Sequence, residues 1–185
     1  MTAWRRRAST LLLDRSPWLR VFADSVELPD GRQVDDFLRV ESRHYATIFA
    51  VTTDHHVLFV RQYKYGPEKE ALQLPAGYLE IGEGAEAGAR RELLEETGHD
   101  ADSWEHLGSY VVDGNRGFGV ANFFLARDAR PVQAADPGDL EELTLLRVPL
   151  QEVPGILTSG QMVEVSPVAC VGLALARLGH IVSPA

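Results

Sequence analysis

Three glutamates share one face of a predicted helix. The segment from Ala85 to Gly98 is rich in good helix formers and ends on a glycine, the residue that commonly terminates helices. On a helix that turns about 100° per residue, Glu92, Glu95 and Glu96 fall within an arc of about 100°. Like charges on one helix face repel each other by about 0.2–0.5 kcal/mol per pair. Such a face suits a bound cation, and the alternative is an acidic face that is only solvated.

Carboxylate oxygens are hard ligands that suit Mg²⁺ or Mn²⁺. Glu92 and Glu96 lie one helical turn apart on the shared face, so we expect them to be the principal ligands of such an ion. Glu95 is expected to act as an additional ligand or as a general base. The choice between a metal site and a solvated face depends on the spacing of the surrounding residues.

That spacing is specific. Residues 77–98 read GYLEIGEGAEAGARRELLEETG. The segment resembles the signature of the Nudix hydrolases, which is G, five residues, E, seven residues, R-E-U, one residue, E-E, one residue and G-U, where U is bulky and apolar. The matching positions are Gly77, Glu83, Arg91, Glu92, Leu93, Glu95, Glu96 and Gly98. His99 replaces the last apolar residue, at a position that is expected to pack rather than to react.

The resemblance implies an α/β/α sandwich with a mixed sheet, in which a loop–helix–loop carries the site. It also implies metal-dependent hydrolysis of a nucleoside diphosphate linked to another moiety, with the backbone carbonyl of Ala76 as a further metal ligand. Gly77 and Gly98 would be structural. Glu83 precedes the helix and can reach back to Arg91, which predicts an internal clamp between loop and helix.

The base and the substrate contacts are expected outside this segment. In the ADP-ribose pyrophosphatase branch of the family the base is thought to come from a later loop, and here Glu141 and Glu142 follow a Pro-Gly-Asp loop, with Glu141 slightly favoured. Arg61, in an RQY segment that also resembles this branch, is a candidate phosphate contact because guanidinium offers a planar pair of donors. Arg116 could bind a phosphate or stack on a base.

The substrate is predicted as a nucleoside diphosphate sugar. The branch usually carries a proline about fifteen residues beyond the motif, whereas this chain has no proline between Pro75 and Pro131. This difference leaves ADP-ribose itself open. The alternatives are another nucleotide derivative, such as a dinucleotide or a dinucleoside polyphosphate, and a non-catalytic sensor of nucleotide sugars.

Composition limits the partners. The chain has 185 residues and a net charge of −9, which argues against nucleic-acid binding. No segment approaches the roughly 20 apolar residues of a membrane span, and the apolar run after Arg5–Arg7 is too short for a signal peptide. Cys170 is the only cysteine and lies in an apolar run, which predicts buried packing and a reducing, cytoplasmic location.

The remaining pattern predicts an arm followed by one domain. Residues 1–16 are expected to form a lead-in, and residues 18–26 and 33–40 two strands around the turn Pro29-Asp30-Gly31. The predicted domains are 1–42, a β-hairpin arm, and 43–185, the Nudix domain. Further strands are expected at 45–51, 57–63, 104–112, 120–126 and 143–148, with helices at 150–158, broken near Pro154, and at 166–178. The resemblance to the ADP-ribose branch implies that the arm forms a homodimer.

Overall fold

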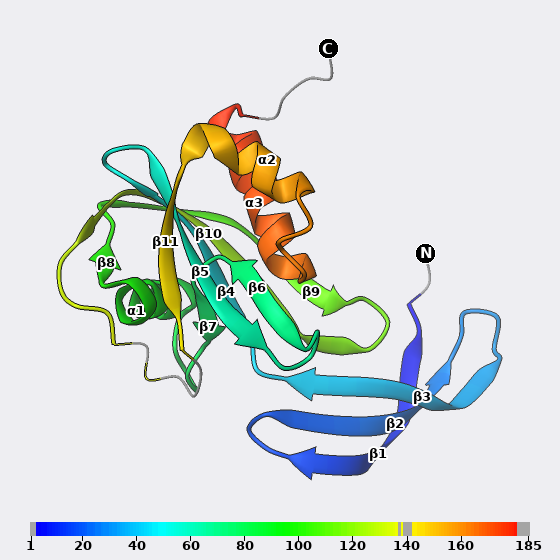
Figure 1. Cartoon of the computed structure of the whole chain (residues 1–185). Helices are drawn as coiled ribbons and strands as arrows, with labels where there is room; N and C mark the ends of the chain where they lie inside the picture. The colour runs from blue at the N-terminus through cyan, green and yellow to red at the C-terminus, as the bar shows by residue number, and fades with distance from the viewer. Residues whose placement is uncertain (1–2, 137, 139–141, 181–185) are drawn as a thin grey trace. The chain divides into compact units, whose positions relative to one another are not determined.

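The computed structural model describes residues 3–136, 138 and 142–180 (Figure 1). The chain divides into two compact units. The N-terminal unit comprises Met1–His44 together with Tyr110–Val120, and the main unit comprises Tyr45–Ser109 together with Ala121–Ala185.

The N-terminal unit is built on three antiparallel strands joined in sequence. They are β1 (Arg5–Arg15), β2 (Leu19–Glu27) and β3 (Gln33–Ser42). The turn between β2 and β3 is closed by a hydrogen bond from the backbone N–H of Gly31 to the carbonyl of Leu28, 3.0 Å. The first residue of β10 adds one parallel bridge, Gly117 to Val40.

Strand β1 corrects the prediction of a lead-in over residues 1–16. Its side chains are almost all exposed, so the alternation of apolar and polar residues that marks a half-buried strand is missing. The strand is ordered by its ladder with β2 and by ion pairs such as Arg7 to Glu27, 2.6 Å. The predicted hairpin is therefore a three-stranded sheet.

The main unit contains a mixed sheet in the order β10–β4–β5–β11. β10 and β4 are parallel, while β5 is antiparallel to β4 and to β11. Short strands extend it, since β6 pairs with β5, β7 with β4, and β8 and β9 with β10. The strands are β4 (Tyr45–Thr52), β5 (His56–Lys64), β6 (Lys69–Gln73), β7 (Ala76–Tyr78), β8 (His99–Asp100), β9 (Ser103–Asp113), β10 (Gly117–Pro131) and β11 (Thr144–Pro149).

Helices cover both faces of this sheet, with α1 on one side and α2 and α3 on the other (Figure 1). The helices are α1 (Ala85–Thr97), the 3-10 turn η1 (Leu150–Glu152), α2 (Val153–Thr158) and α3 (Val165–Leu178). The predicted α/β/α sandwich is confirmed. The helical segment predicted at 150–158 is divided next to Pro154, where η1 gives way to α2 at Val153. The proline occupies the first turn of α2, where its missing N–H costs no hydrogen bond.

Alternation along β4 builds the two cores. Phe49 and Val51 pack in a cluster with residues of α2 and α3, whereas Ile48 and Ala50 pack in a second cluster with Ala89 and Leu93 of α1. Cys170 is fully buried in the first cluster, and burial raises the pKa of its thiol, so its predicted packing role is confirmed. Among the described residues, no helix is long and apolar enough to span a membrane.

Gly98 ends α1 in a conformation that only glycine adopts easily. Its φ is +69°, and a Cβ there would lie 2.3 Å from the carbonyl oxygen of Gln133. We expect Gly98→Ala to lower the free energy of unfolding by about 2–4 kcal/mol, measured by urea denaturation.

The control is Gly172→Ala in α3, where an added Cβ meets nothing within 4 Å. Because alanine is the better helix former, this variant should be unchanged or up to about 1 kcal/mol more stable. Equal effects in the two variants would contradict the account of Gly98.

Candidate active site

The loop before α1 is fixed to the sheet by backbone pairing. Strand β7 pairs Ala76 with Thr47 and Tyr78 with Tyr45 of β4. The backbone N–H of Ile48 donates to the carbonyl of Pro75, 2.9 Å. The backbone at Ala76 and Gly77 is therefore held rigidly where the side chains of α1 reach it.

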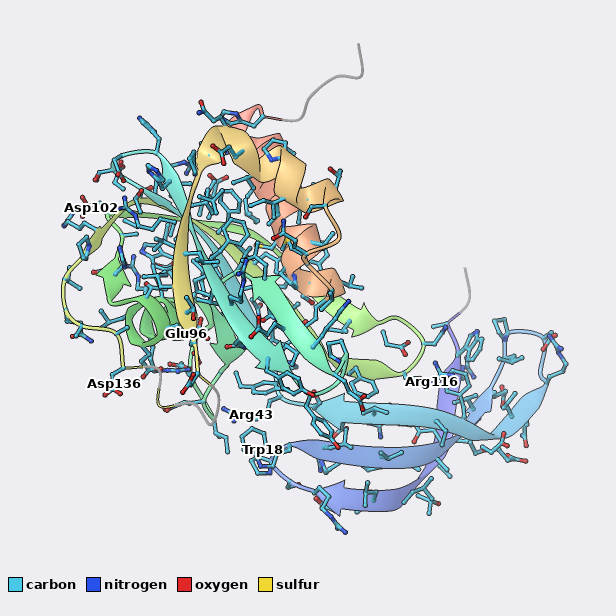
Figure 2. The ribbon with its side chains drawn as sticks, in the orientation of Figure 1. Trp18, Arg43, Glu96, Asp102, Arg116 and Asp136 are labelled. Atoms are coloured by element: carbon cyan, nitrogen blue, oxygen red, sulfur yellow. The ribbon has the colours of Figure 1, made fainter. Side chains whose placement is uncertain are left out.

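Two carboxylates of α1 lie against this backbone. Glu96 is 4% exposed and accepts a hydrogen bond from the N–H of Ala76, 3.0 Å; Figure 2 labels Glu96 on α1. The carboxylate of Glu92 lies so close to Gly77 that a Cβ at Gly77 would be 2.1 Å from its carboxyl carbon. Glycine at position 77 is therefore what allows Glu92 to approach.

Arg91 joins the loop to the helix, and the predicted clamp with Glu83 is present. The Arg91 guanidinium donates from Nε to Glu83 Oε1, 3.0 Å, and from Nη2 to Glu83 Oε2, 2.9 Å. The same group donates to Glu92, 2.6 Å, and to Glu95, 3.0 Å. These carboxylates, with Glu83 as the largest contribution, raise the pKa of Arg91 well above its usual range.

The residues present fit a divalent cation. Glu92 and Glu96 meet beside Ala76, so the carboxylates and the backbone residue of the predicted ligand set lie together. Within the described ranges, no group of three or more His, Cys, Asp or Glu side chains is already arranged to hold a metal. The Arg91 guanidinium holds the carboxylates of Glu92 and Glu95 on the same face of α1.

Arg61 pairs with the first residue of β11, and Glu142 precedes that strand. Arg61 is exposed on β5, and its backbone pairs with Thr144 of β11 and Leu72 of β6. Glu142 is exposed and precedes β11 by two residues, whereas Glu141 lies outside the described residues.

The segment that follows β10 contacts the C-terminal part of α1. The N–H of Asp136 donates to the carbonyl of Glu95, 2.8 Å. Figure 2 labels Asp136. Asp136 is therefore bonded to the backbone of the acidic helix.

Arg116 belongs to the N-terminal unit rather than to the unit that carries the acidic helix. Its backbone N–H donates to Asp113 Oδ1, 3.0 Å, and its guanidinium lies 3.4 Å from Asp113 Oδ2. His99 is buried, and its Nδ1 lies 2.7 Å from the carbonyl oxygen of Thr97, as expected for a packing position.

Sequence reasoning missed a polar network beside the loop. Gln73, at the end of β6, donates to Glu164 at the start of α3, and the hydroxyl of Tyr45 bonds Ser166. These contacts tie α3 to β6, which leads into the loop, and to β4, which pairs with Ala76. Gln73 is a buried polar residue within the apolar approach to the motif, which is the signal that could have indicated it.

Comparisons with known proteins agree with this geometry. The NUDIX domain family matches residues 42–164, and the nucleoside diphosphate sugar hydrolase N-terminal domain family matches residues 4–37. The crystal structure of an ADP compounds hydrolase superposes with a TM-score of 0.78 at 24% sequence identity, covering 96% of this chain and 99% of that chain.

Curated relatives include enzymes and an activator. The chain is 30% identical to the methanol dehydrogenase activator of Bacillus methanolicus, over 72% of each protein. It is 26% identical to the ADP-ribose pyrophosphatase of Bacillus subtilis over 78% of each protein. It is 28% identical to the ADP compounds hydrolase NudE of Escherichia coli, over 77% of this chain and 76% of that protein.

A glycine loop followed by an acidic helix, set on an α/β/α sandwich, defines a pyrophosphohydrolase. The domain match covers well over half of the chain. The chain belongs to the Nudix family.

The clamp makes a testable contribution to stability. We expect Glu83→Gln and Arg91→Gln each to lower the free energy of unfolding, and a double-mutant cycle in urea to give a coupling of about 1–3 kcal/mol, because both groups are mostly buried and bonded through two hydrogen bonds.

The matched control is the exposed pair Arg90 and Glu86, which lie one turn apart on the same helix, 3.0 Å from each other. Its coupling should stay at about 0.3–0.5 kcal/mol. A coupling near zero for Glu83 and Arg91 would show that the clamp does not hold the loop.

Proposed function

We propose that this protein hydrolyses the diphosphate bond of a nucleoside diphosphate sugar, giving a nucleoside monophosphate and a sugar phosphate, with Mg²⁺ or Mn²⁺ as cofactor. The observation that most strongly supports this proposal is that Glu92 and Glu96 both lie against the backbone of Ala76 and Gly77. The match of residues 4–37 to a nucleoside diphosphate sugar hydrolase domain supports this substrate class. The names of the relatives from B. subtilis and E. coli support an ADP-containing compound.

The reaction is a displacement by water. A water oxygen forms a bond to one phosphorus, the bond from that phosphorus to the bridging oxygen breaks, and the bridging oxygen leaves on the other phosphate. The proton of the water passes to a carboxylate. A bound divalent ion supplies charge neutralisation and a water of lowered pKa.

The ion would be held by Glu92, Glu96 and the carbonyl of Ala76, with Glu95 as a further ligand. Glu92 lies against Gly77, and Glu96 accepts a hydrogen bond from the Ala76 N–H. Both carboxylates are therefore already close to the backbone that would supply the third ligand. Glu95 is 43% exposed and can turn toward a ligand. Gly77, Gly98, Glu83 and Arg91 keep the loop and helix in place.

The proton acceptor is Glu95 or a glutamate of the later loop, Glu141 or Glu142. Glu95 accepts a hydrogen bond from Arg91, 3.0 Å, so it would have to leave that guanidinium to reach an attacking water. Glu142 is exposed two residues before β11, and this exposure supports it as a source of the base. Arg61, whose backbone pairs with Thr144 at the start of β11, is the candidate phosphate contact.

A second substrate class has one observation in its favour. The E. coli relative is named as a hydrolase of ADP compounds in general, which supports a dinucleotide or another ADP derivative as substrate. The complete set of motif carboxylates favours either enzymatic reading over a non-catalytic sensor. The single buried cysteine, Cys170, suits a reducing compartment, and we place the reaction in the cytoplasm.

The test is a hydrolysis screen with variants. Nucleotide sugars, dinucleotides and dinucleoside polyphosphates are incubated with the protein and Mg²⁺ or Mn²⁺, and released phosphomonoester is measured. We expect a nucleoside diphosphate sugar to be the best substrate and Glu92→Gln and Glu96→Gln each to lower kcat by at least about 10²-fold, because a lost ligand removes transition-state charge stabilisation.

Glu86→Gln is the matched control, since this exposed glutamate of α1 pairs with Arg90 and not with the loop. Its kcat should stay within about twofold of the parent value, because it removes no predicted ligand. If the folded Glu92→Gln and Glu96→Gln variants kept the kcat of the parent protein, their assignment as metal ligands would be wrong.

We further propose that the protein is a homodimer assembled through the N-terminal unit, whose nucleotide site draws on both chains. This unit exposes large apolar side chains that need cover: Leu11, Leu12, Trp18, Leu38, Val111, Val112 and Phe118. Two-fold dimers that use one surface twice are the commonest oligomers.

Sedimentation equilibrium of the full chain tests the dimer. We expect a dimer at micromolar concentration, and we expect Leu12→Lys and Leu38→Lys to weaken it at least about tenfold, because a charge replaces a buried apolar contact. Val132→Lys, at a similarly exposed valine of the main unit, should leave the dimer intact. A full-length monomer with full activity would refute the proposal.

A further inference from the structure

The Ala76 carbonyl lies on the side of β7 that faces away from β4. In an antiparallel ladder, paired residues alternate between those that exchange backbone hydrogen bonds and those that do not. The N–H of Ile48 donates to Pro75, 2.9 Å, so at the next residue, Ala76, the N–H and the carbonyl point away from β4. The N–H of Ala76 accordingly donates to Glu96, 3.0 Å. The place of β7 therefore decides how far the carbonyl stands from the acidic helix.

The strand that leads into β7 is held by the segment before α3. The N–H of Leu72 donates to the carbonyl of Gln161, 3.2 Å. The buried side chain of Gln73 donates from its amide nitrogen to the carboxylate of Glu164. Strand β6 ends at Gln73, three residues before Ala76. Glu164 thus holds the end of β6 from which the chain continues to the metal-ligand backbone.

The carboxylate of Glu164 serves β6 rather than its own helix. Glu164 is the N-cap residue of α3, yet its side chain forms no capping hydrogen bond. Side chains at this position commonly accept hydrogen bonds from the first turn of the helix, and the helix dipole favours a negative charge there. Because the carboxylate instead accepts from Gln73, the start of α3 and the end of β6 are fixed to each other.

The start of α3 also holds the strand with which β7 pairs. The hydroxyl groups of Tyr45 and Ser166 share a hydrogen bond, and the backbone of Tyr45 pairs with Tyr78, the last residue of β7. Burial, with a smaller contribution from the charge of Glu164, raises the pKa of Tyr45, so the hydroxyl keeps its proton. The first turn of α3 therefore reaches the chain before β7 and the strand beside it.

From this arrangement we infer that Glu164 is a positioning residue of the proposed metal site. Through Gln73 it holds the connection between β6 and β7, and with it the Ala76 carbonyl, at the distance that a cation bound by α1 requires. The inference rests on the proposed function in one respect, which is that a divalent cation binds at the acidic helix. Glu164 acts through the backbone and is not itself a ligand.

The test applies two measurements to the full chain and its variants. Electron paramagnetic resonance gives the Kd for Mn²⁺ alone, and hydrogen exchange of peptides covering residues 72–78 reports opening of the loop. We expect Glu164→Ala to raise the Kd at least about tenfold, as is typical for residues that orient metal ligands. Exchange of these peptides should become at least about threefold faster, while peptides of α1 keep the parent rate, because the lost contact is local.

The conservative variant and a neighbour provide the controls. Glu164→Gln should keep the Kd for Mn²⁺ within about threefold of the parent, because its amide oxygen can still accept from Gln73. Gln73→Leu removes the donor of the same bond and should raise the Kd as Glu164→Ala does. Val165→Ala should change neither measurement, since this neighbouring side chain is 83% exposed.

Hydrolysis kinetics separate positioning from ligation. Glu164→Ala should need at least about tenfold more Mn²⁺ for half-maximal activity and should approach the parent kcat at saturating Mn²⁺. A lost ligand would instead lower kcat itself.

An unchanged Kd for Mn²⁺, or unchanged exchange of residues 72–78, in folded Glu164→Ala and Gln73→Leu would overturn the inference. A lower melting temperature with the parent Kd would do the same, because it would limit Glu164 to a contribution to stability. A parent protein that binds no Mn²⁺ would refute the metal site and this inference together. A parent that binds Mn²⁺ but hydrolyses none of the tested nucleotides would refute only the hydrolase proposal.

Discussion

The Arg91 guanidinium is the interaction on which the acidic helix depends. Glu83, Glu92 and Glu95 would repel one another if they were left alone, and Arg91 donates to all three. It also donates to the carbonyl of Tyr78, 3.0 Å, so the same group holds the loop backbone. One partly buried cation therefore offsets the local charge and holds the loop against the helix.

Rigidity of the loop comes from the sheet and from α3. The β7 pairing fixes the backbone from Ala76 to Tyr78, and the N–H of Ala76 is satisfied by Glu96. Glu164 bonds Gln73, just before the loop, so α3 supports the strand that feeds it. A helix on the opposite face from α1 thus helps to hold the loop that α1 contacts.

The sequence predicts this site better than its surroundings, for a physical reason. The fixed spacing of residues around Glu92 and Arg91 is typical of a loop followed by a helix, which is a local structure. The helix α1 forms as expected at Ala85–Thr97. Strand β1 has no apolar alternation, and β6 and β7 are too short to show a period, so their order comes from partners distant in sequence. The pairing of Gln73 with Glu164 is likewise invisible before the chain folds.

From their spacing in the sequence Glu92 and Glu96 look equivalent, but the fold gives the two carboxylates different surroundings. Glu92 is bonded to Arg91, so a cation that used it would share or displace that guanidinium. Glu96 accepts a hydrogen bond from the backbone N–H of Ala76 and is nearly fully buried. A cation held by both residues would therefore meet Glu92 beside a guanidinium and Glu96 beside a backbone amide. This difference depends on β7, which places Ala76 against α1 after the chain has folded, so the spacing of the glutamates does not show it.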